Sequence, residues 1–197
     1  FRGMEKLDSI IYFGNSLTSW LIALAFIVGS VILARIVKVI FSHVVKKYTA
    51  STENDLDDKI AEQIEEPISL AIVLLGFWFA YSHLVFQGSG ETIAQIFQIA
   101  FVLDLTWLLS RLLDALVEGL LIRSAARDKS SMINQIGPIL RKSVRSIVWI
   151  LGVITAMNNA GYDVAALLAG VGIGGLALAM AAKDFVANIF GGIAVFV

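Results

Sequence analysis

The chain contains no cysteine and only two histidines and two prolines. The absence of cysteine excludes disulfides, thiolate nucleophiles and cysteine-bound metals. His43 and His83 stand alone in the sequence, and no serine has a histidine or lysine partner at a spacing suited to nucleophilic catalysis. We therefore expect no metal, no cofactor and no enzymatic activity.

Charged residues are also scarce. They make up 16% of the 197 residues, and hydrophobic residues make up 58%, whereas a soluble domain has about a quarter charged residues. The mean hydropathy of +0.83 predicts an integral membrane protein. The net charge of −1 offers no basic excess, so we expect no nucleic-acid partner.

Long apolar segments recur at the length of about 20 residues that crosses a bilayer as a helix. They predict an all-α integral membrane protein with five transmembrane helices, at 17–45, 68–86, 92–122, 144–158 and 164–182. We divide the chain into an amphipathic lead-in at 1–16, the first three helices with their loops at 17–137, and the last two helices at 138–197. Pro67 is expected to begin the second helix, and Gly137-Pro138 to break a polar loop at 123–142.

The last stretch, 164–197, is unusual because glycine and alanine dominate it. Glycine inside a helix is about 1 kcal/mol less favourable than alanine, so this composition indicates close backbone approach between helices. Leu176 and Met180 are four residues apart and share one helical face. They predict either two apolar rings around the pore of an oligomer, or an ordinary buried helix. The small residues expected to pack are Gly170, Gly172, Gly174, Gly175, Ala177, Ala179 and Ala182.

Lys183 and Asp184 interrupt this apolar stretch. The remaining residues, 185–197, are too few to span a bilayer. We expect a break or kink near 183–184, with Asp184 capping a second helix near the membrane surface. The residues assigned to the kink and the inner mouth of the pore are Lys183, Asp184, Asn188, Gly191 and Gly192.

Ionisable residues inside the membrane are functional candidates by default. Four of them fall on one stripe of the third predicted helix: Asp104, Arg111, Asp114 and Glu118. Arg111 is expected to form a structural ion pair with Asp114 or Glu118. Asp104 lies deeper, which makes it the stronger functional candidate.

Basic residues also predict the orientation of the chain. The connections at 46–66 and 123–142 carry lysine and arginine and are expected inside, whereas those at 87–91 and 158–163 have neither and are expected outside. Five spans then place the N-terminus outside and the C-terminal end in the cytoplasm.

The segment G-I-G-G-L-A-L-A-M-A-A-K-D-F-V-A-N-I-F-G-G-I, residues 172–193, resembles the pore helix of the small-conductance mechanosensitive (MscS-like) channels. Alignment on Asn188 places Leu176 and Met180 at the gate positions of that family and Gly192 at a second-half glycine. The chain departs from the pattern at Asp184, where the best-known member has the glycine at which its helix kinks.

The resemblance implies a homoheptameric ion channel in the cell inner membrane, opened by membrane tension and protecting against osmotic downshock. Its partners would be membrane lipids, permeating ions and further copies of itself. The β and α/β cytoplasmic domain of the family is absent from these 197 residues, and we expect the chain to be part of a longer protein. The alternative is a secondary transporter with a broken glycine-rich helix, although no charged side chain lies in the stretch before Lys183.

Overall fold

The structure is a computed structural model that describes residues 11–49, 55–86, 90–127 and 131–196. Two short strands, β1 (Ile11–Tyr12) and β2 (Asn15–Ser16), precede five long helices. The helices are α2 (Leu17–Thr49), α3 (Asp55–Ser82), α4 (Gly90–Arg127), α5 (Ser131–Asn159) and α6 (Ala165–Phe196). The chain divides into two compact units, Phe1–Ala160 and Gly161–Val197, so that α6 stands in a unit of its own.

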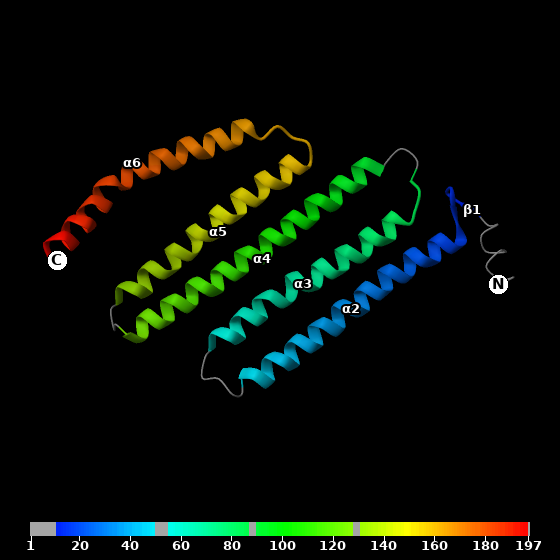
Figure 1. Ribbon diagram of the computed structural model, residues 1–197, viewed down its shortest axis with the longest axis horizontal. Helices are drawn as coiled ribbons and strands as arrows, with labels where there is room; N and C mark the ends of the chain where they lie inside the picture. The colour runs from blue at the N-terminus through cyan, green and yellow to red at the C-terminus, as the bar shows by residue number, and fades with distance from the viewer. Residues whose placement is uncertain (1–10, 50–54, 87–89, 128–130, 197) are drawn as a thin grey trace. The chain divides into compact units, whose positions relative to one another are not determined.

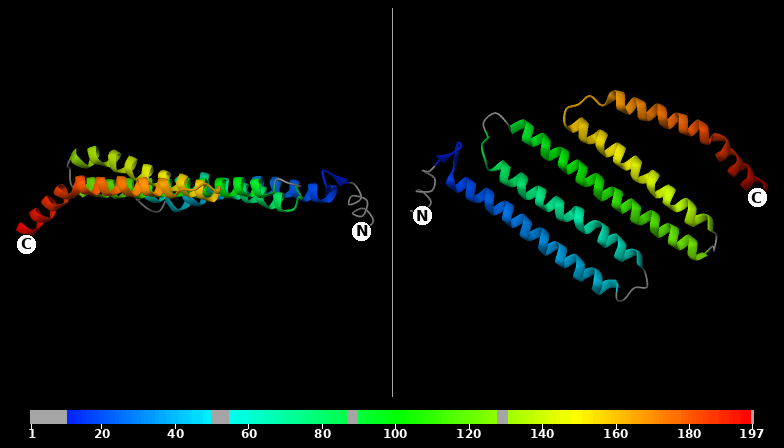
Figure 2. Two further views of the ribbon diagram at one scale, coloured as in Figure 1. Left: turned by 90° about the horizontal axis from the view of Figure 1, so that it is seen from above. Right: turned by 180° about the vertical axis from the view of Figure 1, so that it is seen from behind.

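In the first unit, α2 to α5 lie side by side in chain order, each antiparallel to the one before (Figure 1). Seen edge-on, these four helices form close to a single layer (Figure 2). A single layer leaves both faces uncovered, and many large apolar side chains along α2 to α5 are accordingly exposed. Such a surface is stable in lipid, and the chain is a multi-pass membrane protein.

Small residues hold the layer together. The buried apolar residues are mostly alanines, among them Ala23, Ala80 and Ala115. A Cβ atom at Gly76 of α3 would lie 2.1 Å from the Ser30 Cβ of α2, and one at Gly152 of α5 would lie 2.2 Å from the Thr106 Cγ2 of α4. These two glycines therefore permit the close approach of neighbouring helices that stabilises bundles in lipid.

By length and composition, four described helices can cross a membrane, over Leu17–Phe41, Gln63–Ser82, Gly90–Gly119 and Ala165–Gly192. The sequence predicted a fifth span in α5. That helix begins earlier than predicted and includes the charged residues Arg141, Lys142 and Arg145. Its composition is too polar for it to count among the four candidate spans.

Local predictions at two prolines and one loop were wrong. Pro67 lies inside α3 and Pro138 inside α5, rather than at a helix start and in a loop. The predicted polar loop at 123–142 is helical over 123–127 and 131–142. The described part of the lead-in, 11–16, is a β-hairpin, while residues 1–10 lie outside the described part of the chain.

The glycine contacts predict opposite effects for two similar substitutions. Gly29→Ala adds a methyl group where nothing lies within 4 Å, and it should stabilise α2 by up to about 1 kcal/mol through helix propensity. Gly76→Ala pushes a methyl group into Ser30 and should destabilise the protein by about 1–3 kcal/mol. Thermal unfolding of the purified variants in detergent measures both effects.

Ser30→Gly provides the matched rescue, because it removes the side chain that the new methyl group meets. The double variant with Gly76→Ala should recover most of the lost stability. Equal effects of Gly29→Ala and Gly76→Ala would contradict the close contact between α2 and α3.

Candidate functional site

Two parts of the structure are candidates for function: the apolar surface of α6 and a set of polar contacts that joins α3, α4 and α5. We refer to the second as the polar belt, defined by Gln63, Glu66, Arg111, Asp114, Glu118, Arg141 and Arg145.

The surface of α6 is apolar and uncovered. None of the side chains that the structure describes between Ala165 and Gly192 is buried, and Leu176 and Met180 are 65% and 69% exposed. A Cβ atom at Gly172 or Gly175 would meet no heavy atom within 4 Å. In a single chain, then, α6 presents side chains and glycines alike to whatever surrounds it.

The faces of α6 differ in bulk. An α-helix turns by about 100° per residue, which places Leu176 and Met180 on one stripe and Leu178 on the opposite side. Small residues flank the stripe on both sides: Gly172, Gly175, Ala179 and Ala182 on one, and Gly170, Ala177 and Ala181 on the other. The stripe of Leu176 and Met180 thus has small residues on both sides, and the roles assigned to the stripe and its flanks stay predictions.

The predicted break at Lys183 and Asp184 is not an interruption of the helix. The α6 helix continues through both residues to Phe196, so Asp184 does not cap a separate second helix. The helix instead bends in its C-terminal part (Figure 2). Asn188, Gly191 and Gly192 belong to the same continuous helix.

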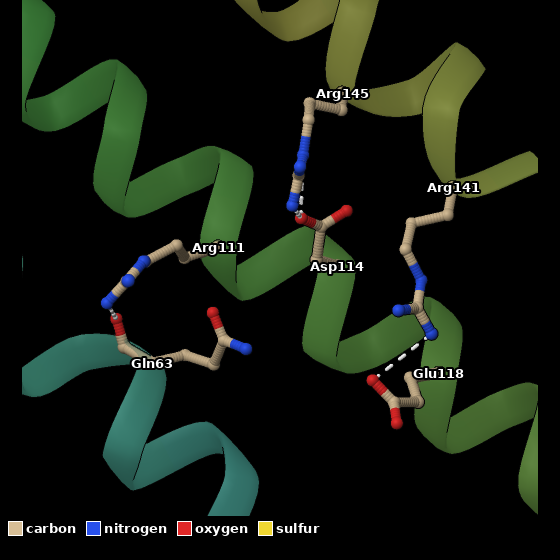
Figure 3. A network of polar contacts seen from close by, with 6 residues as sticks. All are labelled: Gln63, Arg111, Asp114, Glu118, Arg141 and Arg145. Carbon is tan, nitrogen blue, oxygen red and sulfur yellow. Dashed lines mark hydrogen bonds and ion pairs between the residues drawn. The ribbon is translucent and has the colours of Figure 1, made fainter. Parts of the chain in front are cut away.

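The polar belt begins with two ion pairs between α4 and α5 (Figure 3). Arg145 of α5 donates through both Nε and Nη2 to one carboxylate oxygen of Asp114 in α4, with the Nε contact at 2.9 Å. The Asp114 side chain is only 5% exposed. One turn further along, Arg141 Nη2 lies 3.1 Å from Glu118 Oε2. These pairs fix the register of the two helices.

Arg111 connects α4 to α3 in a different way. Pro67 is fully buried within α3 and has no N–H to donate to the carbonyl of Gln63, four residues earlier. Arg111 Nη1 donates to this carbonyl oxygen at 3.3 Å (Figure 3), and its Nη2 lies 2.6 Å from Glu66 Oε2. The guanidinium also lies 4.8 Å from the ring centre of Trp107. Arg111 thus satisfies the carbonyl that the proline leaves free.

The predicted pairing of Arg111 with Asp114 or Glu118 was therefore wrong. All three residues lie in α4 as expected, but Arg111 pairs with Glu66 of α3, and Asp114 and Glu118 pair with arginines of α5. Spacing within one helix could not identify Arg141, Arg145 or Glu66 as partners. The available signal for these partners was the group of lysines and arginines before the fourth apolar run. Their polarity predicts a loop rather than a helix that pairs with α4.

Asp104 differs from the belt residues. It is 6% exposed at the middle of the span Gly90–Gly119, and its Oδ1 atom has no hydrogen-bond partner among the described residues. The residues that the structure describes contain no group of three or more His, Cys, Asp or Glu side chains arranged to hold a metal ion. Asp104 consequently stays a candidate without an assigned chemistry.

The α4–α5 pairs predict an asymmetric mutational effect. Arg145→Gln leaves the buried Asp114 carboxylate without its cation, whereas Asp114→Asn leaves a half-exposed arginine that water can solvate. Arg145→Gln should therefore lower the unfolding temperature more. The double-mutant cycle in detergent should give a coupling of about 0.5–3 kcal/mol.

The pair of Lys38 and Glu65, 3.3 Å apart between α2 and α3, is the control because the lysine is 59% exposed. Its cycle should give no more than about 1 kcal/mol. A coupling between Asp114 and Arg145 as small as this would show that the belt does not stabilise the α4–α5 register.

The family model described as the mechanosensitive ion channel, transmembrane helices 2/3, matches residues 144–183, which cover most of α5 and the first part of α6. No solved structure matches the chain.

Several curated proteins are similar over almost the whole chain. Two are from Methanocaldococcus jannaschii: the large-conductance mechanosensitive channel MscMJLR, 29% identical over 96% of this chain, and the small-conductance mechanosensitive channel MscMJ, 32% identical over 94%. An uncharacterized MscS family protein of Aquifex aeolicus is 26% identical over 96% of this chain. In each case the chain spans 53% of the relative, so it corresponds to about half the length of the curated relatives it matches.

Proposed function

Because the chain belongs to the MscS-like family of mechanosensitive channels, we propose that it is the membrane part of an ion channel opened by membrane tension. The observation that best supports this proposal is the surface of α6. This helix has a bulky stripe between glycine and alanine flanks, and none of its described side chains between Ala165 and Gly192 is buried within its own chain. Family membership gives no reason to assign an enzymatic activity.

In this proposal Leu176 and Met180 form the gate. A glycine-rich helix surface gains little from lipid, because it offers few atoms for van der Waals contact. The same surface lets identical helices approach closely. If each flank packs on the opposite flank of the next copy, the bulky stripes of all copies point to a common axis. Apolar rings at that axis close a pore by expelling water.

The packing of one flank on a different flank is a heterologous contact, which generates a closed ring when the rotation between copies closes. We propose a homoheptamer, the state that the family resemblance implies. Gly170, Gly172, Gly174, Gly175, Ala177, Ala179 and Ala182 form the contacts between copies, and Lys183, Asp184, Asn188, Gly191 and Gly192 line the bend and inner mouth.

The layer of α2 to α5 is proposed to sense tension. Its apolar side chains are exposed on both faces of the layer, where lipid can act on them. Tension favours the state that occupies more membrane area, so these helices would tilt as the pore widens. The polar belt supports this role because it holds α3, α4 and α5 in a fixed register. If these helices could move independently, their tilt would not be transmitted to the pore.

Location and partners follow from the same proposal. We place the protein in the cell inner membrane, with the N-terminus outside and the C-terminal end in the cytoplasm. Its partners are membrane lipids, permeating ions and other copies of the chain. Release of solutes through the open pore would protect the cell during osmotic downshock.

The gate predicts that polarity at the stripe opens the channel more easily. Leu176→Ser and Met180→Ser in the complete protein should each hydrate one ring and lower the tension threshold in patch recordings. The double variant should open at lower tension than either single variant, because both rings are then wetted. Recordings from membrane patches under controlled suction measure the threshold.

Leu178→Ser is the matched control, since it makes the same change on the opposite side of the same helix. It should leave the threshold near that of the parent protein. A shift at Leu178 equal to those at Leu176 and Met180 would mean that the stripe does not face the pore.

The ring predicts that added bulk on a flank prevents assembly. Gly175→Leu should force neighbouring copies apart at a cost of about 1–3 kcal/mol for each contact, so particle images should show fewer complete rings. Leu178→Phe adds bulk on the side away from the stripe and should assemble as the parent does. A monomer or dimer for the parent protein itself would instead support the secondary transporter.

A further inference from the structure

The chain enters α2 through a tight β-hairpin with an aromatic residue at its tip. Strands β1 and β2 pair antiparallel with Tyr12 opposite Asn15, which leaves Phe13 and Gly14 as the turn. Both turn residues have positive φ, 50° at Phe13 and 79° at Gly14, as in a type I′ turn. Asparagine is preferred at the first of these positions, whereas a bulky side chain is strained there. The fold thus keeps an aromatic residue where turn chemistry disfavours it.

The hairpin is held firmly in this conformation. Asn15 is 4% exposed; its side-chain Nδ2 donates to the Val85 carbonyl at 2.9 Å, and its Oδ1 accepts from the Val85 N–H at 2.6 Å. The Trp20 Nε1 donates to the Tyr12 carbonyl at 3.2 Å. These bonds attach the hairpin both to the start of α2 and to the segment after α3. A strained residue held by its surroundings in this way points to a function for that residue.

The strained residue at the tip has almost no packing of its own within the described chain. Phe13 is 92% exposed, and Ile11 and Tyr12 are 69% and 58% exposed. The described hairpin, residues 11–16, carries no charged residue. Packing of the Phe13 ring within the described chain therefore does not offset the strain.

The position of the hairpin indicates what the exposed tip contacts. The candidate span Leu17–Phe41 begins directly after the hairpin, and the span Gln63–Ser82 ends just before Val85. The hairpin thus lies beside the ends of two candidate membrane spans. Leu21 and Leu24, in the first two turns of α2 directly after the hairpin, are also exposed apolar side chains.

We propose that the hairpin is a membrane-surface anchor, in which Phe13, with Ile11 and Tyr12, inserts between the head groups and acyl chains of the leaflet where α2 begins. Aromatic side chains are favoured at this depth. The anchor fixes the level of the N-terminal end of α2, and of the α3 end attached to it through Asn15 and Val85. This role goes beyond the channel function and holds whatever the protein conducts.

These 197 residues contain no cysteine, so a single cysteine introduced here carries the only label once any cysteine in the rest of the complete protein has been replaced. Ile11→Cys places a nitroxide beside an intact Phe13, and Glu91→Cys places one on the exposed first turn of α4 at the same end of the spans. The measurement is made in vesicles of phosphatidylcholine and phosphatidylglycerol. It compares how often each nitroxide collides with dissolved oxygen and how often it collides with a nickel chelate. The ratio of oxygen collisions to chelate collisions should be several-fold higher at position 11 than at position 91. Equal ratios at the two positions would overturn the proposal.

Phe13→Asn in the position-11 labelled protein tests the aromatic ring itself. Asparagine followed by glycine is favoured in a type I′ turn, so the hairpin should still form. The collision ratio at position 11 should then fall toward the value at position 91. An unchanged ratio would show that Phe13 is not the anchor. Short distances between labels on neighbouring copies, with no enrichment in oxygen contact, would assign the tip to a contact between chains and would also overturn the proposal.

Discussion

In a bilayer, an apolar side chain gains nothing by leaving lipid for protein, and this constraint determines how the helices of the chain are held together. Burial of large apolar residues cannot order α2 to α5, and many of those residues in fact remain exposed. What remains is close backbone contact and polar bonds. Gly76 against Ser30 and Gly152 against Thr106 supply the first, and the polar belt supplies the second. The two are distributed along the same layer, so that each helix is joined to its neighbour.

The polar belt also explains how a proline lies inside α3. A proline within a helix leaves the carbonyl four residues earlier without its usual donor. Arg111 fills this role for Gln63 and balances its own charge with Glu66. One side chain thereby satisfies a backbone acceptor, forms an ion pair and joins α3 to α4. Pro67 and Arg111 are consequently parts of one structural arrangement, although they lie on different helices.

The all-α membrane class and four of the membrane-crossing helices could be predicted because long apolar runs are stable as helices in lipid. The same reasoning failed at Pro67, Pro138 and the 123–142 segment, where partners distant in the sequence decide the local structure. Arg111 lies 48 residues from the carbonyl that it satisfies, and helical spacing shows only neighbours within one helix. The gate, the flanks and the bend of α6 stay predictions, since they depend on contacts between copies of the chain.

The glycines of the chain nevertheless bear on that question. Gly76 and Gly152 each lie against a neighbouring helix so closely that a Cβ atom would not fit. Gly170, Gly172, Gly174 and Gly175 follow one another along α6 with no heavy atom within 4 Å of a Cβ placed there. One such open glycine, as at Gly29 of α2, has little consequence. Four within one helix weaken it by about 1 kcal/mol each relative to alanine, and lipid offers no compensation. A second α6 from another copy does, because two smooth surfaces gain contact along their whole length. In the ring that we propose, the glycines of α6 therefore permit close approach between helices, as Gly76 of α3 and Gly152 of α5 do within one chain.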